Sequence, residues 1–280
     1  MRIARVFPRR TRATPDDALA FTGPPDMFPV DADAVHVSVA FTYDMPKAEA
    51  LAKSWESVAP ATIGGPGAGT RGEDFVPGRY LKPGYVITSR GCPNRCWFCT
   101  VPVRDGTTRE LPITHGHDLL DDNLLACSEA HIKAVFAMLS HQKVRAKFTG
   151  GLEARRIMDW HIELLAALRP ESVFLAYDTP DDWEPLAEVT PKLIAAGIAK
   201  GHRLRCYVLI GFRDDSMAAA QGRLDATMRI GLAPMPMLYR AQDAVKHDPE
   251  WRRLARHYAR SAIAYAAGAA SSPEGAGGSR

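Results

Sequence analysis

The sequence lacks the features of an exported or membrane-spanning protein. It has no apolar run of about 18 residues and no apolar core near its first residues, so neither a membrane span nor an export signal is expected. Its five cysteines are an odd number, which disfavours a disulfide framework and indicates a reducing compartment. A formal net charge of +3 is too small to indicate a nucleic-acid partner by itself. These features predict a soluble cytoplasmic protein without a membrane partner.

What the sequence does have is a dense cysteine cluster. Cys92, Cys96 and Cys99 follow a C-x3-C-x2-C spacing in a loop that also contains proline, asparagine and arginine. Three thiolates at this spacing can bind one iron–sulfur cube and leave one iron without a protein ligand. A zinc site is the alternative, but its fourth ligand would have to come from His115 or His117, which lack the usual paired spacing. A further alternative is that the three cysteines are buried structural residues. The polar character of the loop disfavours this alternative, because polar residues are rarely buried.

The cysteine spacing, the aromatic Phe98 before the third cysteine and the strand expected at 84–89 resemble the radical S-adenosylmethionine (SAM) superfamily. The resemblance implies that Cys92, Cys96 and Cys99 hold a [4Fe–4S] cluster whose open iron chelates the amino and carboxylate groups of SAM. It further implies reductive cleavage of SAM to a 5′-deoxyadenosyl radical, which abstracts hydrogen from an unidentified substrate. An electron donor of the flavodoxin or ferredoxin type is implied as the partner.

Residues 1–75 are expected to form a small, half-Rossmann-like α/β appendage. Alternation predicts strands at 34–41 and 61–63, helical spacing predicts a helix at 46–58, and 64–69 is a glycine turn. The segment resembles a shortened cobalamin-binding domain of one radical SAM branch. It lacks the Asp-x-His-x-x-Gly motif of histidine ligation, and its histidine, His36, lies within an apolar alternation. Binding of cobalamin without a histidine ligand, against the glycine turn, stays open.

Residues 76–266 are expected to form an α/β domain, a partial (β/α)6 TIM-like barrel, because strand and helix patterns alternate there. Residues 267–280, rich in Gly, Ser and Ala, are expected to be disordered. The expected strands are 85–89, one leading to 119–123, 146–149, 172–177, 204–210 and 235–239. The expected helices are 129–142, 156–168, 184–196, 217–230 and 249–266.

Ligands of parallel α/β folds bind at the carboxyl ends of strands, so polar and glycine residues there are the candidate SAM contacts. The resemblance assigns the amino group of SAM to a motif after the second strand and adenine to backbone after the first and fifth. A carboxylate after the fourth strand could hold ribose hydroxyls. A glutamate and an arginine after the third strand are candidates for polar groups of SAM. The residues are Phe98, Asp121, Asp122, Asn123, Gly150, Gly151, Glu153, Arg155, Asp178 and Gly211.

Alternatives accompany several of these assignments. Asp121–Asn123 replaces the more usual Gly-Gly-Glu-like motif and could equally cap a helix, and Glu153 could pair with Arg156 at a helix start. Cys127 and Cys206 are expected to be ordinary buried residues. A radical methyltransferase or methylthiotransferase acting on RNA or a peptide is a rival function, although no second cysteine triplet exists. A non-catalytic iron–sulfur or zinc-binding module is a rival of another class.

Overall fold

The computed structural model describes residues 1–27, 29–198, 203–240 and 248–269, and only the backbone of 260–269. The chain divides into two compact units. Unit 1 comprises Met1–Ala146 and Arg240–Ala244, and unit 2 comprises Lys147–Tyr239 and Val245–Arg280. Each unit is an α/β structure with parallel strand pairing, which confirms the predicted fold class at that level. The curvature of a partial barrel stays a prediction.

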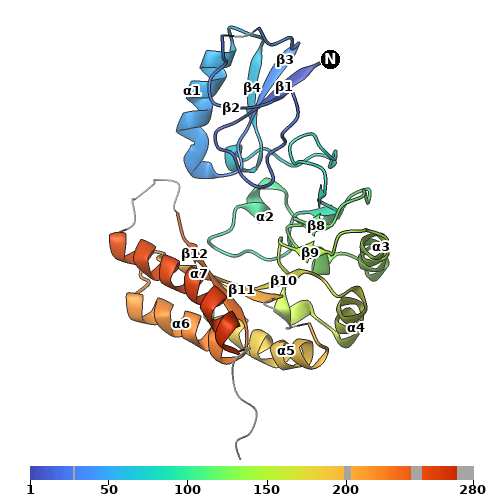
Figure 1. Cartoon of the computed structure of the whole chain (residues 1–280), viewed down its shortest axis with the longest axis vertical. Helices are drawn as coiled ribbons and strands as arrows, with labels where there is room; N and C mark the ends of the chain where they lie inside the picture. The colour runs from blue at the N-terminus through green and yellow to red at the C-terminus, as the bar shows by residue number, and fades with distance from the viewer. Residues whose placement is uncertain (28, 199–202, 241–247, 270–280) are drawn as a thin grey trace, which may run out of the picture. The chain divides into compact units, whose positions relative to one another are not determined.

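Unit 1 begins with a four-stranded parallel sheet of order β2-β1-β3-β4 (Figure 1). Helix α1 connects β3 to β4, so these three elements form a βαβ unit. The predicted strands and helix of this region are therefore confirmed, with bounds that differ by a few residues. The bounds are β1 Ile3–Phe7, β2 Ala20–Thr22, β3 Ala34–Ser38, η1 Thr42–Asp44, α1 Met45–Trp55, β4 Ala61–Gly64 and η2 Pro66–Ala68.

Strands β1 and β2 were not expected from the sequence. Arg5 interrupts the apolar pattern of β1, yet its side chain is largely buried, because its guanidinium donates to the carbonyls of Gly78 and Arg79 and pairs with Asp17. A buried arginine with such partners is compatible with a central strand. The apolar pattern alone could not reveal these partners, two of which lie more than 70 positions away.

The core of this sheet forms where α1 packs on β3 and β4. Trp55 is fully buried and its indole N–H donates to the carbonyl of Gly23 at 2.9 Å. The glycine turn after β4 has a packing reason, since a Cβ on Gly67 would lie 2.6 Å from the backbone of Phe41. The loop that follows β4 therefore packs directly on the backbone of the loop that follows β3.

The rest of unit 1 carries the cysteine loop. The strand expected at 85–89 is two short strands: β5 pairs with β8 in parallel, and β6 pairs with β7 as an antiparallel hairpin around the cysteines. The strand expected to lead to 119–123 ends at Leu119. The bounds are β5 Tyr85–Val86, β6 Ser89–Arg90, α2 Val101–Arg104, β7 Arg109–Glu110, β8 Asp118–Leu119, η3 Leu124–Ala126 and α3 Glu129–Ser140.

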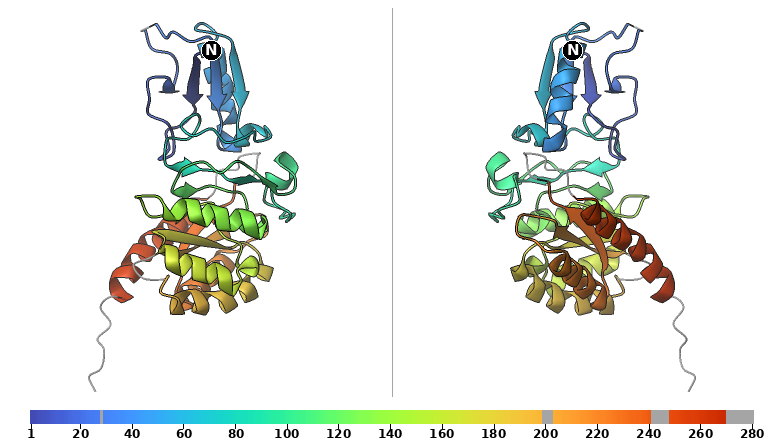
Figure 2. Two further views of the ribbon diagram at one scale, coloured as in Figure 1. Left: turned by 90° about the vertical axis from the view of Figure 1, so that its right-hand side faces the viewer. Right: turned by 90° about the vertical axis from the view of Figure 1, so that its left-hand side faces the viewer.

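Unit 2 alternates strand and helix as predicted, and its strands β9 to β12 form a parallel sheet in chain order. Figure 2 shows the helices of this unit packed around its strands, and α6 and α7 both contact β12. The bounds are β9 Lys147–Phe148, η4 Ala154–Arg156, α4 Asp159–Leu168, β10 Ser172–Tyr177, η5 Pro180–Asp182, α5 Trp183–Ala195, β11 Leu204–Ile210, α6 Met217–Arg229, β12 Ala233–Leu238 and α7 Pro249–Ala269.

The last helix continues past its predicted end at residue 266, since α7 includes residues 267–269. The remainder of the predicted disordered tail, 270–280, lies outside the described residues. Among the described helices, none combines the length and the apolar character that crossing a membrane requires.

Candidate functional site

The three clustered cysteines lie on one loop of unit 1, between β6 and α2. All three are free thiols and are partly exposed. The loop is folded by its own backbone, because the N–H of Cys92 donates to the carbonyl of Gly106 at 3.0 Å and the N–H of Cys99 donates to the carbonyl of Cys96 at 3.1 Å. The sulfurs are therefore carried by a defined turn rather than by an open chain.

Gly91, directly before the first cysteine, can only be a glycine in this loop. Its φ of 83° is left-handed, and a Cβ would lie 2.3 Å from the carbonyl oxygen of Thr107. Its N–H donates to a carboxylate oxygen of Asp122 at 2.9 Å. The loop is thus fixed by a tight crossing of two backbone segments and by a carboxylate that follows β8.

Asp121 holds the strand that enters the loop. It is almost fully buried and accepts three hydrogen bonds, from the Thr88 backbone N–H at 2.6 Å, the Thr88 hydroxyl at 2.6 Å and the Ser89 hydroxyl at 2.9 Å. Burial is the largest influence on its pKa and raises it, while the hydrogen bonds from Thr88 and Ser89 act in the opposite direction. The carboxyl group is therefore engaged in fixing β6.

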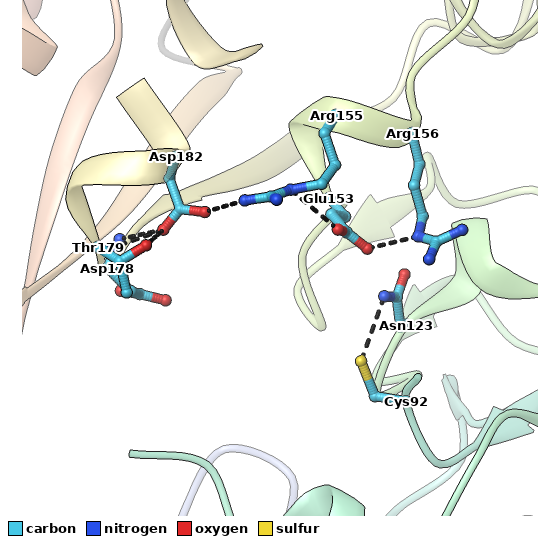
Figure 3. A network of polar contacts seen from close by, with 8 residues as sticks. All are labelled: Cys92, Asn123, Glu153, Arg155, Arg156, Asp178, Thr179 and Asp182. Atoms are coloured by element: carbon cyan, nitrogen blue, oxygen red, sulfur yellow. Dashed lines mark hydrogen bonds and ion pairs between the residues drawn. The ribbon is translucent and has the colours of Figure 1, made fainter. Parts of the chain in front are cut away.

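Asp122 and Asn123 also act on the loop. Asp122 lies 3.3 Å from the guanidinium of Arg104, which pairs at 2.6 Å with Asp105 as well. The side-chain amide of Asn123 donates to the sulfur of Cys92 at 3.4 Å (Figure 3). Asn123 stands at the N-cap position of η3, as the helix-cap alternative predicts, but makes no side-chain capping bond there.

The surroundings of the thiols differ along the chain. Burial is the largest influence raising the pKa of Cys99, and the Cys92 thiol raises it further. Burial also raises the pKa of Cys127 to about 11, and Cys206 is fully buried in β11. Cys206 is confirmed as an ordinary buried residue, whereas Cys127 is only partly buried and lies beside Ser89.

Unit 2 carries a second set of the predicted residues, joined by ion pairs that Figure 3 draws. Arg155 pairs with Asp182 at 2.8 Å and with Glu153 at 3.2 Å, and Arg156 pairs with Glu153 at 2.6 Å. The predicted alternative, a Glu153–Arg156 pair at a helix start, is therefore present in the structure. The guanidinium of Arg155 is already shared between two carboxylates, so its side chain is pre-oriented by the chain itself.

Asp178 follows β10, beside the same network. Burial, and after it the negative charge of Asp182, raises the pKa of Asp178 to about 7. Asp182 accepts hydrogen bonds from the backbone N–H groups of Asp178 and Thr179 and from the Thr179 hydroxyl, so its charge is fixed in place. The Asp178 carboxyl is thus harder to ionise than an exposed aspartate.

The predicted glycines of unit 2 lie at turns after strands. Gly151 and Gly211 have left-handed φ values of 90° and 70°, and Gly150 precedes the first of these turns. The N–H of Gly211 donates to Asp215, which is buried and pairs with Arg223 at 2.8 Å. Phe98 is partly exposed and its ring meets Trp97 edge-on at 5.4 Å.

Sequence reasoning missed several residues that shape these sites. Asp182, Arg104 and the Asp215–Arg223 pair hold the predicted residues in position but lie outside any motif. Only Asp182 had a local signal, because it directly precedes α5, whereas Arg104 and Arg223 lie within helices. Within the described ranges, no three His, Cys, Asp or Glu side chains are gathered closely enough to hold one metal ion.

No protein-family model and no curated protein matches this chain.

Proposed function

We propose that the chain is a radical SAM enzyme. In this proposal Cys92, Cys96 and Cys99 hold a [4Fe–4S] cluster, and SAM is cleaved reductively to a 5′-deoxyadenosyl radical that acts on an unidentified substrate. The observation that carries the proposal is the C-x3-C-x2-C spacing on a folded loop with three free, partly exposed sulfurs. We also propose that the protein acts in the cytoplasm and that a flavodoxin- or ferredoxin-type protein supplies its electrons.

The donor set suits a cluster better than a single ion. A zinc ion needs four ligands converging on one point, whereas a four-iron cube takes each thiolate on a different iron. Sulfurs that are not gathered about one point are therefore compatible with a cube. The N–H of Asn123 directed at the Cys92 sulfur supports this assignment, because hydrogen bonds to ligand sulfurs tune a cluster's reduction potential.

When bound, the cluster would supply the electron that cleaves SAM. The chain's own contribution in unit 1 is to fix the loop through Asp121 and Asp122 and to donate a hydrogen bond through Asn123. In unit 2, Glu153 and Arg155 would bind polar groups of SAM or substrate, and Asp178 would bind ribose hydroxyls. Arg155 can take this role while keeping both of its ion pairs, because a guanidinium carries five N–H donors and the pairs with Glu153 and Asp182 use Nε and Nη2.

The test is anaerobic reconstitution with iron and sulfide, followed by reduction in the presence of SAM. We expect about four irons per chain and formation of 5′-deoxyadenosine, slowly even without substrate. Cys99→Ala should abolish both. Cys127→Ala is the matched control and should leave both intact, because Cys127 lies outside the loop spacing.

Two results would contradict the proposal. Stoichiometric zinc without iron or sulfide in protein prepared anaerobically would exclude the cluster. Cluster-replete, reduced protein that neither binds nor cleaves SAM would replace the enzyme with a non-catalytic iron–sulfur module.

A further inference from the structure

Unit 1 contains a cavity of about 750 Å³ at the carboxyl edge of its four-stranded sheet. Arg9 follows β1, Ser38 ends β3 and Gly65 follows β4, and all three line the cavity. The carboxyl edge of a parallel α/β sheet is the usual position of a ligand. The volume lies within the range of about 300–1,000 Å³ typical of small-molecule sites.

Another part of the lining, around Gly72, is fixed by residues of the cysteine hairpin (β6, β7 and the loop between them). The N–H of Gly72 donates to Asp105 at 2.7 Å and its carbonyl accepts from Arg109 at 2.6 Å. A Cβ on Gly72 would lie 2.8 Å from Nε of Arg90, so the guanidinium of Arg90 lies directly against this backbone. The cavity therefore has two walls held by hydrogen bonds before any ligand binds.

Two of the arginines that line the cavity are neutralised by carboxylates of the chain. Arg9 pairs with Asp44, and Arg104 pairs with Asp105 and Asp122. Arg9 and Asp44 balance each other, whereas Arg104 faces two carboxylates. Burial has the larger effect on the pKa of the Arg90 guanidinium and lowers it, while these two carboxylates act on it in the opposite direction.

Three other lining arginines, Arg71, Arg79 and Arg90, form no ion pair with any described residue. Of the lining carboxylates in the described chain, only Glu73 is likewise without an ion pair, and its side chain is exposed. Nε of Arg90 is buried and has no hydrogen-bond partner. A buried N–H donor is costly to leave unpaired, so Nε of Arg90, together with the cations of Arg71 and Arg79, indicates an anionic partner from outside the chain.

The cavity also offers apolar and aromatic surface beside these cations. Tyr80, Phe75 and Leu81 line it, and the guanidinium of Arg79 lies 5.3 Å from the centre of the Tyr80 ring. A guanidinium stacked on an aromatic ring presents its N–H donors at the ring's margin, where they can reach an anion.

We propose that this cavity binds a small organic anion, whose phosphate or carboxylate group pairs with Arg90 and whose apolar or aromatic body lies against Tyr80 and Phe75. The proposal does not depend on the cluster or on SAM cleavage, because all of these residues belong to unit 1 and none is a cysteine. A phosphate and a carboxylate each offer two negatively charged oxygens that can accept paired N–H donors from one guanidinium.

The test uses three probes with one ring system: 1-naphthyl phosphate, 1-naphthoate and the neutral 1-naphthol. Each is titrated calorimetrically into the full-length protein. We expect at least one of the anions to bind at least about tenfold more tightly than the neutral probe. The tighter anion identifies the group for which the cavity is built.

The variants locate the site. Arg90→Gln should weaken the tighter anion about tenfold or more and leave the weak binding of 1-naphthol unchanged. Arg71→Gln should weaken binding of the same anion several-fold. Because Arg71 is exposed, this variant is not expected to disturb folding near the cysteine loop, so its effect can be attributed to lost binding. Arg2→Gln, an exposed arginine of the same unit whose side chain does not line the cavity, is the control and should have no effect.

Two outcomes would overturn the proposal: neutral and anionic probes that bind equally, or anion binding that both Arg90→Gln and Arg71→Gln leave unchanged. Displacement of the anion by saturating SAM would also overturn it, because the cavity would then be a SAM site. Loss of iron binding in the reconstitution experiment would leave this result untouched, so the two proposals fail separately.

Discussion

Asp178→Asn should stabilise unit 2 at neutral and alkaline pH but not in acid. The folded chain raises the pKa of Asp178 to about 7, chiefly through burial and then through the charge of Asp182. In the unfolded chain an aspartate titrates near 3.9. Ionising Asp178 is therefore harder in the folded state, and the folded state holds the extra proton between these two values.

The sign and size follow from linkage. Below about pH 4 both states are protonated at Asp178 and the residue contributes no penalty. Between pH 4 and 7 its contribution to the free energy of unfolding falls by up to about 1.4 kcal/mol per pH unit. Above pH 7 the penalty is constant, at most about 4 kcal/mol. The neutral amide of Asp178→Asn removes this penalty.

The assay is urea unfolding of both proteins at unit intervals from pH 4 to 8. The stability difference between Asp178→Asn and the parent should be near zero at pH 4 and should reach a plateau above pH 7. Asp181→Asn is the matched control, since Asp181 is exposed in the same turn, and it should show no comparable rise. A difference for Asp178→Asn that does not change with pH would refute the reasoning.

Three further substitutions test individual contacts. Asp121→Ala should lower the free energy of unfolding by roughly 3 kcal/mol or more in urea, because three buried donors lose their acceptor; a loss below about 1 kcal/mol would contradict this. Arg155→Gln should weaken SAM or substrate binding in equilibrium dialysis without changing the cluster's visible absorption; unchanged binding would remove Arg155 from the site. Incubation with cobalamin should give no cobalt ligated by His36 in electron paramagnetic resonance of the Co(II) form, because His36 lies within strand β3 and not in an Asp-x-His-x-x-Gly loop; a nitrogen signal that His36→Ala abolishes would show the opposite.

The sequence predicts strands well where apolar residues run without interruption. Strands β10 at Ser172–Tyr177 and β11 at Leu204–Ile210 have the predicted bounds, because each is a buried run bounded by polar turns. Strand β1 was missed because Arg5 interrupts its pattern. The strand expected at 85–89 was too long, because the chain leaves the parallel pair after Val86 and begins the hairpin at Ser89.

The candidate site was predictable only where its geometry is local. The spacing of the three cysteines could be read directly, because all three lie between Cys92 and Cys99. The partners that fix the loop could not, since Asp121 and Asp122 contact residues more than 30 positions earlier in the chain. Arg90 was likewise hidden, because the unpaired state of its Nε is a property of the folded cavity and not of any motif.

The Asp121–Asn123 motif shows how consecutive residues can act on three parts of one loop. Asp121 fixes the strand before the loop, Asp122 fixes the glycine at its start, and Asn123 reaches the first cysteine sulfur. Because the first two carboxylates are already engaged, a ligand that required either would have to break buried hydrogen bonds. Asn123 is therefore the member of the motif best placed to act on whatever Cys92 binds. Asn123→Asp, which replaces an N–H donor by a charge, should shift the potential of a bound cluster more than Asp122→Asn does.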